Sequence, residues 1–342
     1  MRIDPYTSPT LEINMPLQAV ALMGATGTGK SALAMRLAAA TDRCVIACDS
    51  MQVYQGLDIG TAKPSLAEQQ QVRHAVVDCV TVEQTWNAQL WADMARQVIQ
   101  QENERGNIPL IVGGTGMYLQ ALCQGFAQIP AVDEAVRFRL EQQCLDHGIQ
   151  YLYKQLQAVD VQTAQRLQPN DSQRILRALS VFEGTGITLS AWHQRQQQEQ
   201  MQAEKSLNCP VFVLEVPRED LRARLAARFT QMMDLGWLEE CIWLQAQQLE
   251  DTHPVMRAVG YRQLLNHLQR EAQKEMVGDS QDNLQGDYSL EQAVTDGITA
   301  TRRYAKRQNT WFRNQTKDAV RGDTSSLEVV IQQQLSAAQS RI

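Results

Sequence analysis

The chain of 342 residues has no long apolar run, no Cys-x-x-Cys pair and no excess of basic residues. Its longest apolar stretches, such as 19–23 and 109–112, are far shorter than the ~18 residues that cross a bilayer. The acidic residues Asp4 and Glu12 argue against a secretory signal at the N-terminus. Seven scattered cysteines are typical of reduced thiols and have no spacing for a structural zinc site. We therefore expect a cytoplasmic protein with no membrane partner.

A basic surface is also missing from the chain as a whole. Lys and Arg number 32 against 38 Asp and Glu, which gives a formal net charge of −6. Taken as an average, this argues against a nucleic-acid partner, because such partners favour basic surfaces. The other averages are ordinary: 44% hydrophobic and 20% charged residues indicate a globular chain, and its length predicts about two domains.

Apolar runs that alternate with helical patterns predict an α/β protein. Strands are expected at 17–23, 44–48 and 108–112, and helices at 31–40 and 85–101. This alternation implies a parallel sheet with helices on its faces. Further along the chain, a strand is expected at 211–216, helices at 220–236, 237–249, 254–268 and 290–313, and a polar loop or weak helix at 271–288.

Between 131 and 211 the pattern is helical throughout and is divided by the turn signals 169–171 and 184–186. We therefore predict an all-helical insertion at 129–205. The core that it interrupts would be made of residues 16–128 and 206–320. The segments 1–15 and 321–342 are expected to be tails.

The strongest motif is a phosphate-binding loop. Residues 24–31 match G-x-x-x-x-G-K-[ST] in full and lie between a predicted strand and a predicted helix, which is the context that supports this motif. Backbone N–H groups of such a loop surround phosphate oxygens, Lys30 would reach the terminal phosphates, and Ser31 would bind Mg²⁺. The phosphate-binding residues are predicted to be Gly24, Ala25, Thr26, Gly27, Thr28, Gly29, Lys30 and Ser31. The fold class is then a P-loop NTPase-like core with a parallel sheet.

An ordinary P-loop hydrolase should carry more than this loop. The strand 108–112 ends in Gly-Gly-Thr-Gly instead of an acidic residue, and no Asn-Lys-x-Asp element is present, which argues against a GTPase. Asp49 instead follows the second strand and should face the same crevice as the phosphate loop. There it could accept a proton, support Mg²⁺ or simply cap a turn. Lys63 lies in a Gly/Pro-bounded loop that could close over a phosphate, and a solvated lysine is an equal alternative.

One segment departs from the acidic average. Between Gly297 and Lys317 there is no acidic residue, and aromatic residues are interleaved with six cations. Cations neutralise phosphates and aromatic rings stack on unpaired bases, so this pattern is typical of RNA binding. A solvated basic helix with buried aromatics is the alternative. The six cations are Arg302, Arg303, Lys306, Arg307, Arg313 and Lys317.

Seven segments together resemble the tRNA dimethylallyltransferase (tRNA isopentenyltransferase) family. They follow the family order over nearly the whole chain. The segments are GATGTGKS at 24–31, DSMQVY at 49–54, DIGTAKP at 58–64, IVGGTGMYL at 111–119, PNDSQRILRAL at 169–179, RAVGYRQ at 257–263 and TRRYAKRQNTWFR at 301–313.

The resemblance implies transfer of a dimethylallyl group from its diphosphate to the exocyclic N6 amine of adenosine 37, beside the tRNA anticodon. It also implies Mg²⁺ as cofactor, a helical insertion that contacts the anticodon stem-loop, and a monomer. Under this interpretation Asp49 takes the proton from the amine, and Lys30, Arg228 and Thr115 complete the catalytic set. Choosing Arg228 over Arg224 as the diphosphate arginine is a prediction from the family pattern.

Family position also implies the remaining site residues. Lys63 would join the diphosphate site, and Ser31 and Asp49 would hold Mg²⁺. The residues expected to contact or position tRNA are Asp49, Ser50, Met51, Gln52, Thr115, Arg137, Gln173, Arg174, Ile175, Leu176, Arg177, Arg257, Gly260, Tyr261, Arg262, Lys306, Arg307, Gln308, Trp311 and Arg313. A small-molecule kinase of the nucleoside-kinase type and a non-enzymatic, nucleotide-dependent RNA-binding module are the alternative functions. The basic segment at 301–313 argues against the kinase, which has no use for it.

Overall fold

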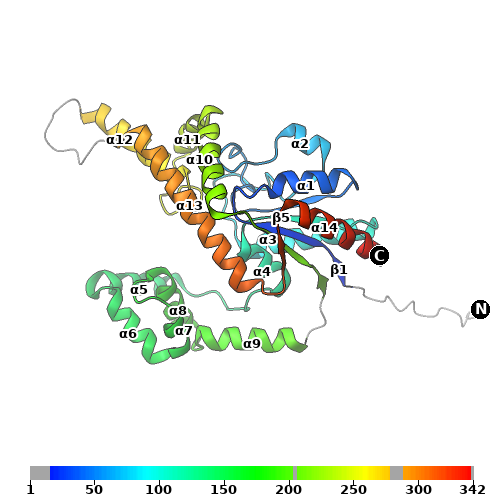
Figure 1. Cartoon of the computed structure of the whole chain (residues 1–342). Coiled ribbons are helices and arrows are strands. Elements are labelled where there is room, and N and C mark those ends of the chain that lie inside the picture. Colours follow the sequence, from blue (N-terminus) through cyan, green and yellow to red (C-terminus); the bar gives the residue numbers. More distant parts are fainter. Residues whose placement is uncertain (1–15, 203–205, 278–287, 340–342) are drawn as a thin grey trace, which may run out of the picture. The chain divides into compact units, whose positions relative to one another are not determined.

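The structure, a computed structural model, describes residues 16–202, 206–277 and 288–339 (Figure 1). It divides into two compact units, Met1–Cys123 with Ser206–Ile342, and Gln124–Lys205. The inserted unit therefore begins at Gln124 and not at 129. In the ranges that the structure describes, no helix is long and apolar enough to span a membrane. The tail expected at 1–15 lies outside the described residues.

A six-stranded parallel sheet in the order β4-β3-β5-β2-β7-β8 forms the centre of the first unit. Its strands β2, β3 and β5 are buried along their whole length, which explains why they are continuous apolar runs in the sequence. The strands are β2 Val20–Gly24, β3 Val45–Cys48, β4 His74–Ala75, β5 Leu110–Gly113, β7 Val211–Leu214 and β8 Val320–Gly322. A separate parallel pair joins β1 (Leu17–Gln18) to β6 (Leu207–Asn208).

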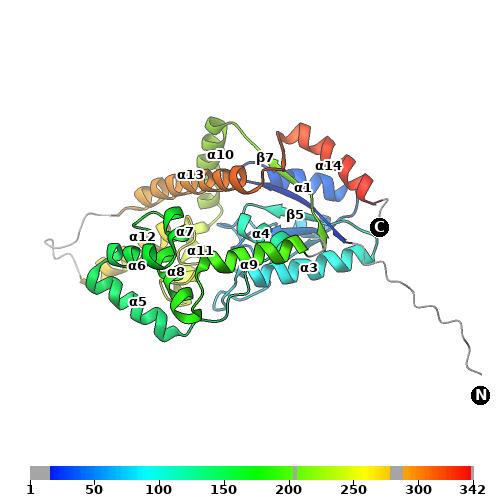
Figure 2. The same cartoon turned by 90° about the horizontal axis from the view of Figure 1, so that it is seen from below.

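Helices cover both faces of the sheet. Figures 1 and 2 show α1 (Lys30–Ala39) and α14 (Thr324–Gln339) on one side of the strands, and α3 (Ala88–Glu104) and α4 (Gly116–Gln124) on the other. The prediction that 321–342 is a tail is wrong for β8 and α14. Leu327, Ile331 and Leu335 recur every four residues and bury one stripe of α14 in the core, while the glutamines between them conceal the stripe in the sequence.

Four helices follow β7 in the described part of the first unit before β8: α10 (Arg218–Asp234), α11 (Trp237–Ala246), α12 (Tyr261–Val277) and α13 (Leu290–Gln315). The helix predicted at 254–268 begins only at Tyr261, because the preceding residues form turns and Gly260 adopts a left-handed φ of 91°. It continues to Val277, so of the two alternatives predicted for 271–288, a polar loop or a weak helix, the structure shows the helix up to that residue. Residues 278–287 lie outside the described part. The short α2 (Leu66–Gln71) begins at a capping box of Ser65 and Glu68.

The second unit consists, in its described residues, of helices only, as predicted. Leu140, Leu152, Leu156, Ile175 and Leu179 are buried and form its own core. The helices are α5 Glu134–His147, α6 Ile149–Val159, α7 Val161–Arg166, α8 Ser172–Thr185 and α9 Leu189–Gln202.

Candidate active site

The carboxyl ends of three neighbouring strands bring the predicted catalytic residues to one edge of the sheet. The phosphate loop follows β2, Asp49 follows β3, and Thr115 follows β5. Because all strands are parallel, their carboxyl ends share one edge, which is where open α/β sheets bind ligands. A cavity of about 310 Å³ lies there, with Lys30, Ser31 and Asp49 in its wall.

The phosphate loop requires its glycines. Gly27 and Gly29 adopt left-handed φ values of 81° and 93°, which other residues rarely do. A side chain on Gly27 would also lie 2.6 Å from the Leu225 Cδ2 atom. The Lys30 ammonium donates to the Ala25 carbonyl oxygen at 3.2 Å, and the Thr28 hydroxyl donates to the same oxygen at 2.9 Å.

Gln308 fastens helix α13 to this loop. Its Oε1 atom accepts the Thr26 N–H at 2.9 Å, and its Nε2 atom donates to the Gly114 carbonyl oxygen at 2.9 Å. Gln308 is buried, so its amide is engaged within the chain. Gln308 thereby connects the basic helix with two loops of the site, and of its two predicted roles, contacting or positioning tRNA, positioning stays a prediction.

The cavity concentrates positive charge around one carboxylate. Within the described part of the chain, Asp49 is the only acidic residue in the cavity wall, against Lys30, Arg228, Arg257 and Arg307. Burial lowers the pKa of Lys30 to about 8, Asp49 opposes this shift and Arg228 adds to it. Burial also lowers the pKa of Arg228, and Asp49 again opposes the shift. Such a site strongly favours an added anion, because desolvated cations are expensive without a partner.

The register of α10 separates the two candidate arginines. Arg228 is partly buried and lies in the cavity wall, whereas Arg224, one turn earlier, is exposed and outside the cavity lining. The placement agrees with the choice of Arg228 as the residue near the diphosphate. Sequence alone could not decide this, because both arginines lie on one helix face.

Two hydrogen bonds define the surroundings of Asp49. Its Oδ1 atom accepts the Met51 N–H at 2.9 Å, which orients the carboxylate. The next residue, Ser50, donates its N–H to the Thr115 hydroxyl at 3.2 Å. Tyr304, a residue of α13, lines the cavity together with Ser50. Thr115 is absent from the described lining of the cavity, and its hydroxyl supports the backbone of Ser50.

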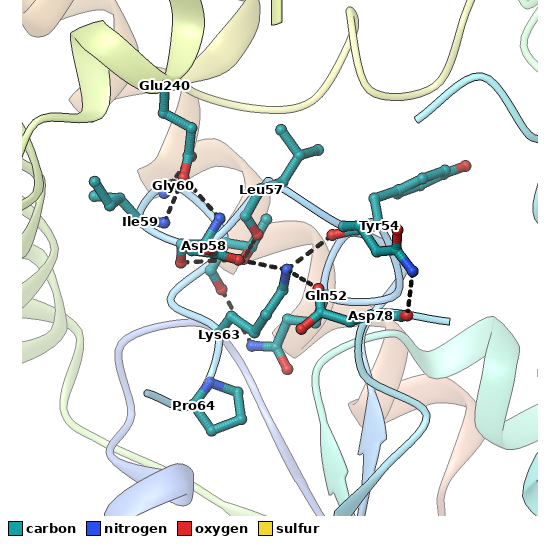
Figure 3. A network of polar contacts seen from close by, with 12 residues as sticks. Gln52, Tyr54, Leu57, Asp58, Ile59, Gly60, Lys63, Pro64, Asp78 and Glu240 are labelled. Atoms are coloured by element: carbon teal, nitrogen blue, oxygen red, sulfur yellow. Dashed lines mark hydrogen bonds and ion pairs between the residues drawn. The ribbon is translucent and has the colours of Figure 1, made fainter. Parts of the chain in front are cut away.

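Lys63 does not lie at the phosphate loop, so its predicted role in diphosphate binding is wrong. Its side chain is 2% exposed, and its ammonium donates to the Tyr54 carbonyl at 2.8 Å, Asp58 at 2.6 Å and Asp78 at 2.5 Å (Figure 3). These three contacts use all three ammonium hydrogens. Lys63 therefore closes a loop, and has no donor left for a phosphate.

The residues predicted to contact RNA fall into three groups. Several line the cavity with Asp49: Ser50, Met51, Gln52, Arg257, Tyr261, Arg307 and Gln308. Others are exposed on helices of the first unit: Arg262, Lys306 and Arg313. In the second unit, Arg137, Gln173, Arg174 and Arg177 are exposed, with Arg137 paired to Glu141 and Arg174 to Asp171.

Four members of the predicted RNA set are buried or packed within the protein. Ile175 is completely buried in the core of the second unit and Leu176 packs against it, so of the two predicted roles, contacting or positioning tRNA, only positioning stays a prediction for these side chains. Gly260 leaves room for the Trp237 ring, which an added Cβ would approach to 2.1 Å. The Tyr261 hydroxyl donates to Glu240 at 2.5 Å. Gly260 and Tyr261 pack against residues of α11, whereas Ile175 and Leu176 belong to the core of the second unit.

Helix α13 has two chemically different faces. Its inner face buries Ala305, Gln308 and Phe312, while Arg302, Arg303, Lys306 and Arg307 are exposed. Trp311 covers Gly116, where a Cβ would lie 2.2 Å from its ring. The basic segment predicted from the sequence is therefore a helix with an exposed cationic face, and Arg307 of that face lies in the cavity wall together with Tyr304 and Gln308.

Sequence reasoning missed three residues at the cavity. Tyr304 and Trp237 line it, and Glu240 holds the loop that forms one wall. Tyr304 was visible only as one of several aromatics in the basic segment. Trp237 and Glu240 belong to α11, which carries no motif, so their position depends on tertiary packing alone.

Comparison with known proteins identifies the family. A family model described as "IPP transferase" matches residues 52–315. The tRNA dimethylallyltransferase of Magnetococcus marinus is 40% identical over 292 residues, 85% of this chain and 90% of that protein. The corresponding protein of Azorhizobium caulinodans is 39% identical over 304 residues, 89% of this chain and 91% of its own.

Solved structures agree with these relatives. A tRNA isopentenylpyrophosphate transferase from Bacillus halodurans has a TM-score of 0.65 at 28% identity and covers 95% of this chain and 97% of its own. A eukaryotic dimethylallyltransferase, crystallised acting on tRNA, has a TM-score of 0.66 at 25% identity and covers 90% of this chain and 74% of its own. The α/β core with a parallel sheet is thus confirmed. The chain belongs to the IPP transferase family, whose relatives are named tRNA dimethylallyltransferases.

Proposed function

We propose that this chain transfers a dimethylallyl group from dimethylallyl diphosphate to the exocyclic N6 amine of adenosine 37, beside the tRNA anticodon. The chain is a prenyl transferase that modifies tRNA, by its family and its relatives. One observation supports the finer proposal most: a phosphate loop, the carboxylate of Asp49 and the inner face of a basic helix share one cavity.

The diphosphate would occupy the phosphate loop. Backbone N–H groups at the start of α1, the Lys30 ammonium and the Arg228 guanidinium supply donors for its oxygens. During transfer the bond between C1 of the prenyl group and the diphosphate oxygen breaks, and charge accumulates on the leaving group. Lys30 and Arg228 would stabilise that charge, and because burial desolvates both side chains their attraction to it would be stronger than in water.

Asp49 would act as the base. The N6 amine forms the new bond to C1, and its proton passes to the Asp49 carboxylate. The hydrogen bond from the Met51 N–H holds this carboxylate in place. An adenine within a stacked loop cannot reach such a cavity, so the base must turn out of the stack.

The donor set also fits Mg²⁺. The Ser31 side chain and the Asp49 carboxylate line the same cavity, and Mg²⁺ in proteins typically takes one or two carboxylates together with substrate phosphates. When bound, the ion would neutralise charge on the diphosphate. Among the described residues there is no cluster of three or more His, Cys, Asp or Glu suited to a metal, so the ion would depend on the substrate oxygens.

The RNA would meet exposed cations on both units. In the first unit these are the outer face of α13 and Arg262, and in the second unit Arg137, Arg174 and Arg177. We expect the active form to be a monomer. The net charge of −6 then leaves acidic surface elsewhere, which discourages non-specific RNA binding.

The decisive assay combines the protein, Mg²⁺, dimethylallyl diphosphate and unmodified tRNA, followed by nucleoside analysis for prenylated adenosine. Asp49→Ala should abolish turnover and leave tRNA affinity unchanged, whereas Asp93→Ala, an exposed acid on α3, should change neither. A parallel loss of binding and rate would mean that Asp49 positions RNA and is not the base. ATP consumption without a prenylated product would instead support a small-molecule kinase.

A further inference from the structure

A carboxylate of the protein fills an anion-binding nest beside the cavity. Glu240, on α11, accepts three successive backbone N–H groups: its Oε2 atom accepts those of Asp58 at 2.7 Å and Ile59 at 2.8 Å, and its Oε1 atom accepts that of Gly60 at 3.0 Å (Figure 3). The Tyr261 hydroxyl also donates to Oε1. Convergent N–H groups of this kind normally hold a phosphate or another anion.

The other end of the same loop is closed by Lys63. Its ammonium connects Asp58 within the loop to Asp78 and to the Tyr54 carbonyl outside it. The Lys63 N–H donates to the Asp58 carbonyl at 3.0 Å, which completes the ring of residues 58–63. The loop is thus fixed to α11 at its start and to a different part of the core at its end.

This loop orients Gln52. The Gln52 Nε2 atom donates to the carbonyl oxygens of Thr61 and Ala62, both at 3.1 Å. Since both amide hydrogens are used, the side chain retains only its Oε1 oxygen as a free hydrogen-bonding group, and that group is an acceptor. Gln52 and residues 60–62 line the cavity that contains Asp49.

We propose that Glu240 is a positioning residue for the transfer reaction: through the loop 58–63 it fixes the Gln52 amide and the cavity wall against which the accepting base is placed. The proposal rests on the proposed function for its reaction. In the described part of the chain, the loop 58–63 shares no hydrogen bond with residues 24–31 of the phosphate loop. Glu240 is therefore expected to act on the acceptor side of the site and not on the phosphate loop. Loss of Glu240 should therefore impair orientation of the acceptor and leave diphosphate binding intact.

The test uses the full-length chain with Glu240→Ala, and Glu239→Ala as the control, since Glu239 is an exposed acid in the same helical turn. Glu240→Ala should lower kcat by roughly 10- to 100-fold, the range expected for a misplaced reactant, with KM for dimethylallyl diphosphate unchanged. Formate is a carboxylate small enough for the nest that Glu240→Ala vacates. It should restore kcat in Glu240→Ala but not change kcat in Glu239→Ala, and the recovery should saturate as the formate concentration rises. Amide hydrogen exchange at 58–60 should accelerate in the variant and slow again with formate.

Three results would overturn the proposal: an unchanged kcat in Glu240→Ala, a parallel rise in KM for the diphosphate, or amide protection restored by formate without any recovery of rate. Glu240→Gln, which keeps one acceptor oxygen, covers the case in which the alanine variant does not fold and should give an intermediate kcat. If the unmodified protein forms no prenylated tRNA, the proposed function fails instead, while amide exchange still reports whether Glu240 orders the loop.

Discussion

Replacing Lys30 by methionine should stabilise the fold while it removes diphosphate binding. The pKa of Lys30 falls from 10.5 to about 8 in the folded chain, chiefly because burial strips water from the ammonium. One pKa unit corresponds to about 1.4 kcal/mol, so the shift of Lys30 means that the charged side chain costs the fold at most about 3.5 kcal/mol. Methionine has a similar length and carries no charge. Lys30→Met should therefore raise the free energy of unfolding by up to about 3.5 kcal/mol near neutral pH.

The pH dependence of this difference follows from the sign of the shift. Below about pH 8 the ammonium is charged in both states, and the folded chain bears the whole penalty. Between about 8 and 10.5 the folded chain has released the proton while the unfolded chain still holds it, so the stability of the unmodified protein rises. The advantage of Lys30→Met should therefore shrink to about 1.4 kcal/mol at about pH 9.5 and vanish at higher pH.

Urea unfolding followed by circular dichroism, at about pH 6.5 and about pH 9.5, measures both quantities. Lys317→Met is the matched control, because Lys317 is exposed in the same unit and its replacement should change stability by less than about 0.5 kcal/mol. Calorimetry should show that Lys30→Met no longer binds dimethylallyl diphosphate. A destabilised Lys30→Met protein, or an advantage independent of pH, would refute the reasoning that burial penalises this ammonium.

Three further predictions concern packing and binding. Arg228→Gln should weaken dimethylallyl diphosphate binding by about 10- to 100-fold in calorimetry, the value of charge-assisted hydrogen bonds, and Arg224→Gln should bind it normally; equal losses would contradict the assignment of Arg228. Gln308→Ala leaves the half-buried N–H of Thr26 and the buried carbonyl of Gly114 without a partner, so its free energy of unfolding in urea should fall by about 2 kcal/mol; no change would show that water replaces the amide. Leu335→Ala should cost about 2–5 kcal/mol in the same measurement, because α14 is part of the core and not a tail; a smaller loss would contradict this.

The parts of the site that the sequence predicted are those defined by local chain direction. A Gly-rich loop between strand and helix, an acid after one strand and a threonine after another must meet at the carboxyl edge of a parallel sheet, and they do. Lys63 was predicted wrongly because its loop is Gly/Pro-bounded like a phosphate lid, and nothing local indicates that Asp78, fifteen residues away, neutralises it.

Long-range packing explains the other differences. Gln308 has the polarity of a surface residue, and only the approach of α13 to the phosphate loop buries it. The segment 254–260 has helical composition, but Gly260 is drawn into a left-handed turn that admits the Trp237 ring. The apolar stripe of α14 is spaced correctly for a helix, yet frequent glutamines resemble a solvated tail. In each case the deciding partner is far away in the sequence.

The place of β5 in the sheet sets a length scale for the proposed chemistry. β5 lies between β2, which carries the phosphate loop, and β3, which carries Asp49. Two strand spacings separate the supports of leaving group and base by about 10 Å. The contact between the attacking amine and C1 would take about 3 Å, and the hydrogen bond from the amine to the carboxylate about 3 Å. Together with the P–O–C linkage of the substrate, these lengths take up most of the span. Under the proposed function, the diphosphate, the transferred carbon, the amine and the carboxylate would therefore have to fit within the two strand spacings that β5 sets between the phosphate loop and Asp49.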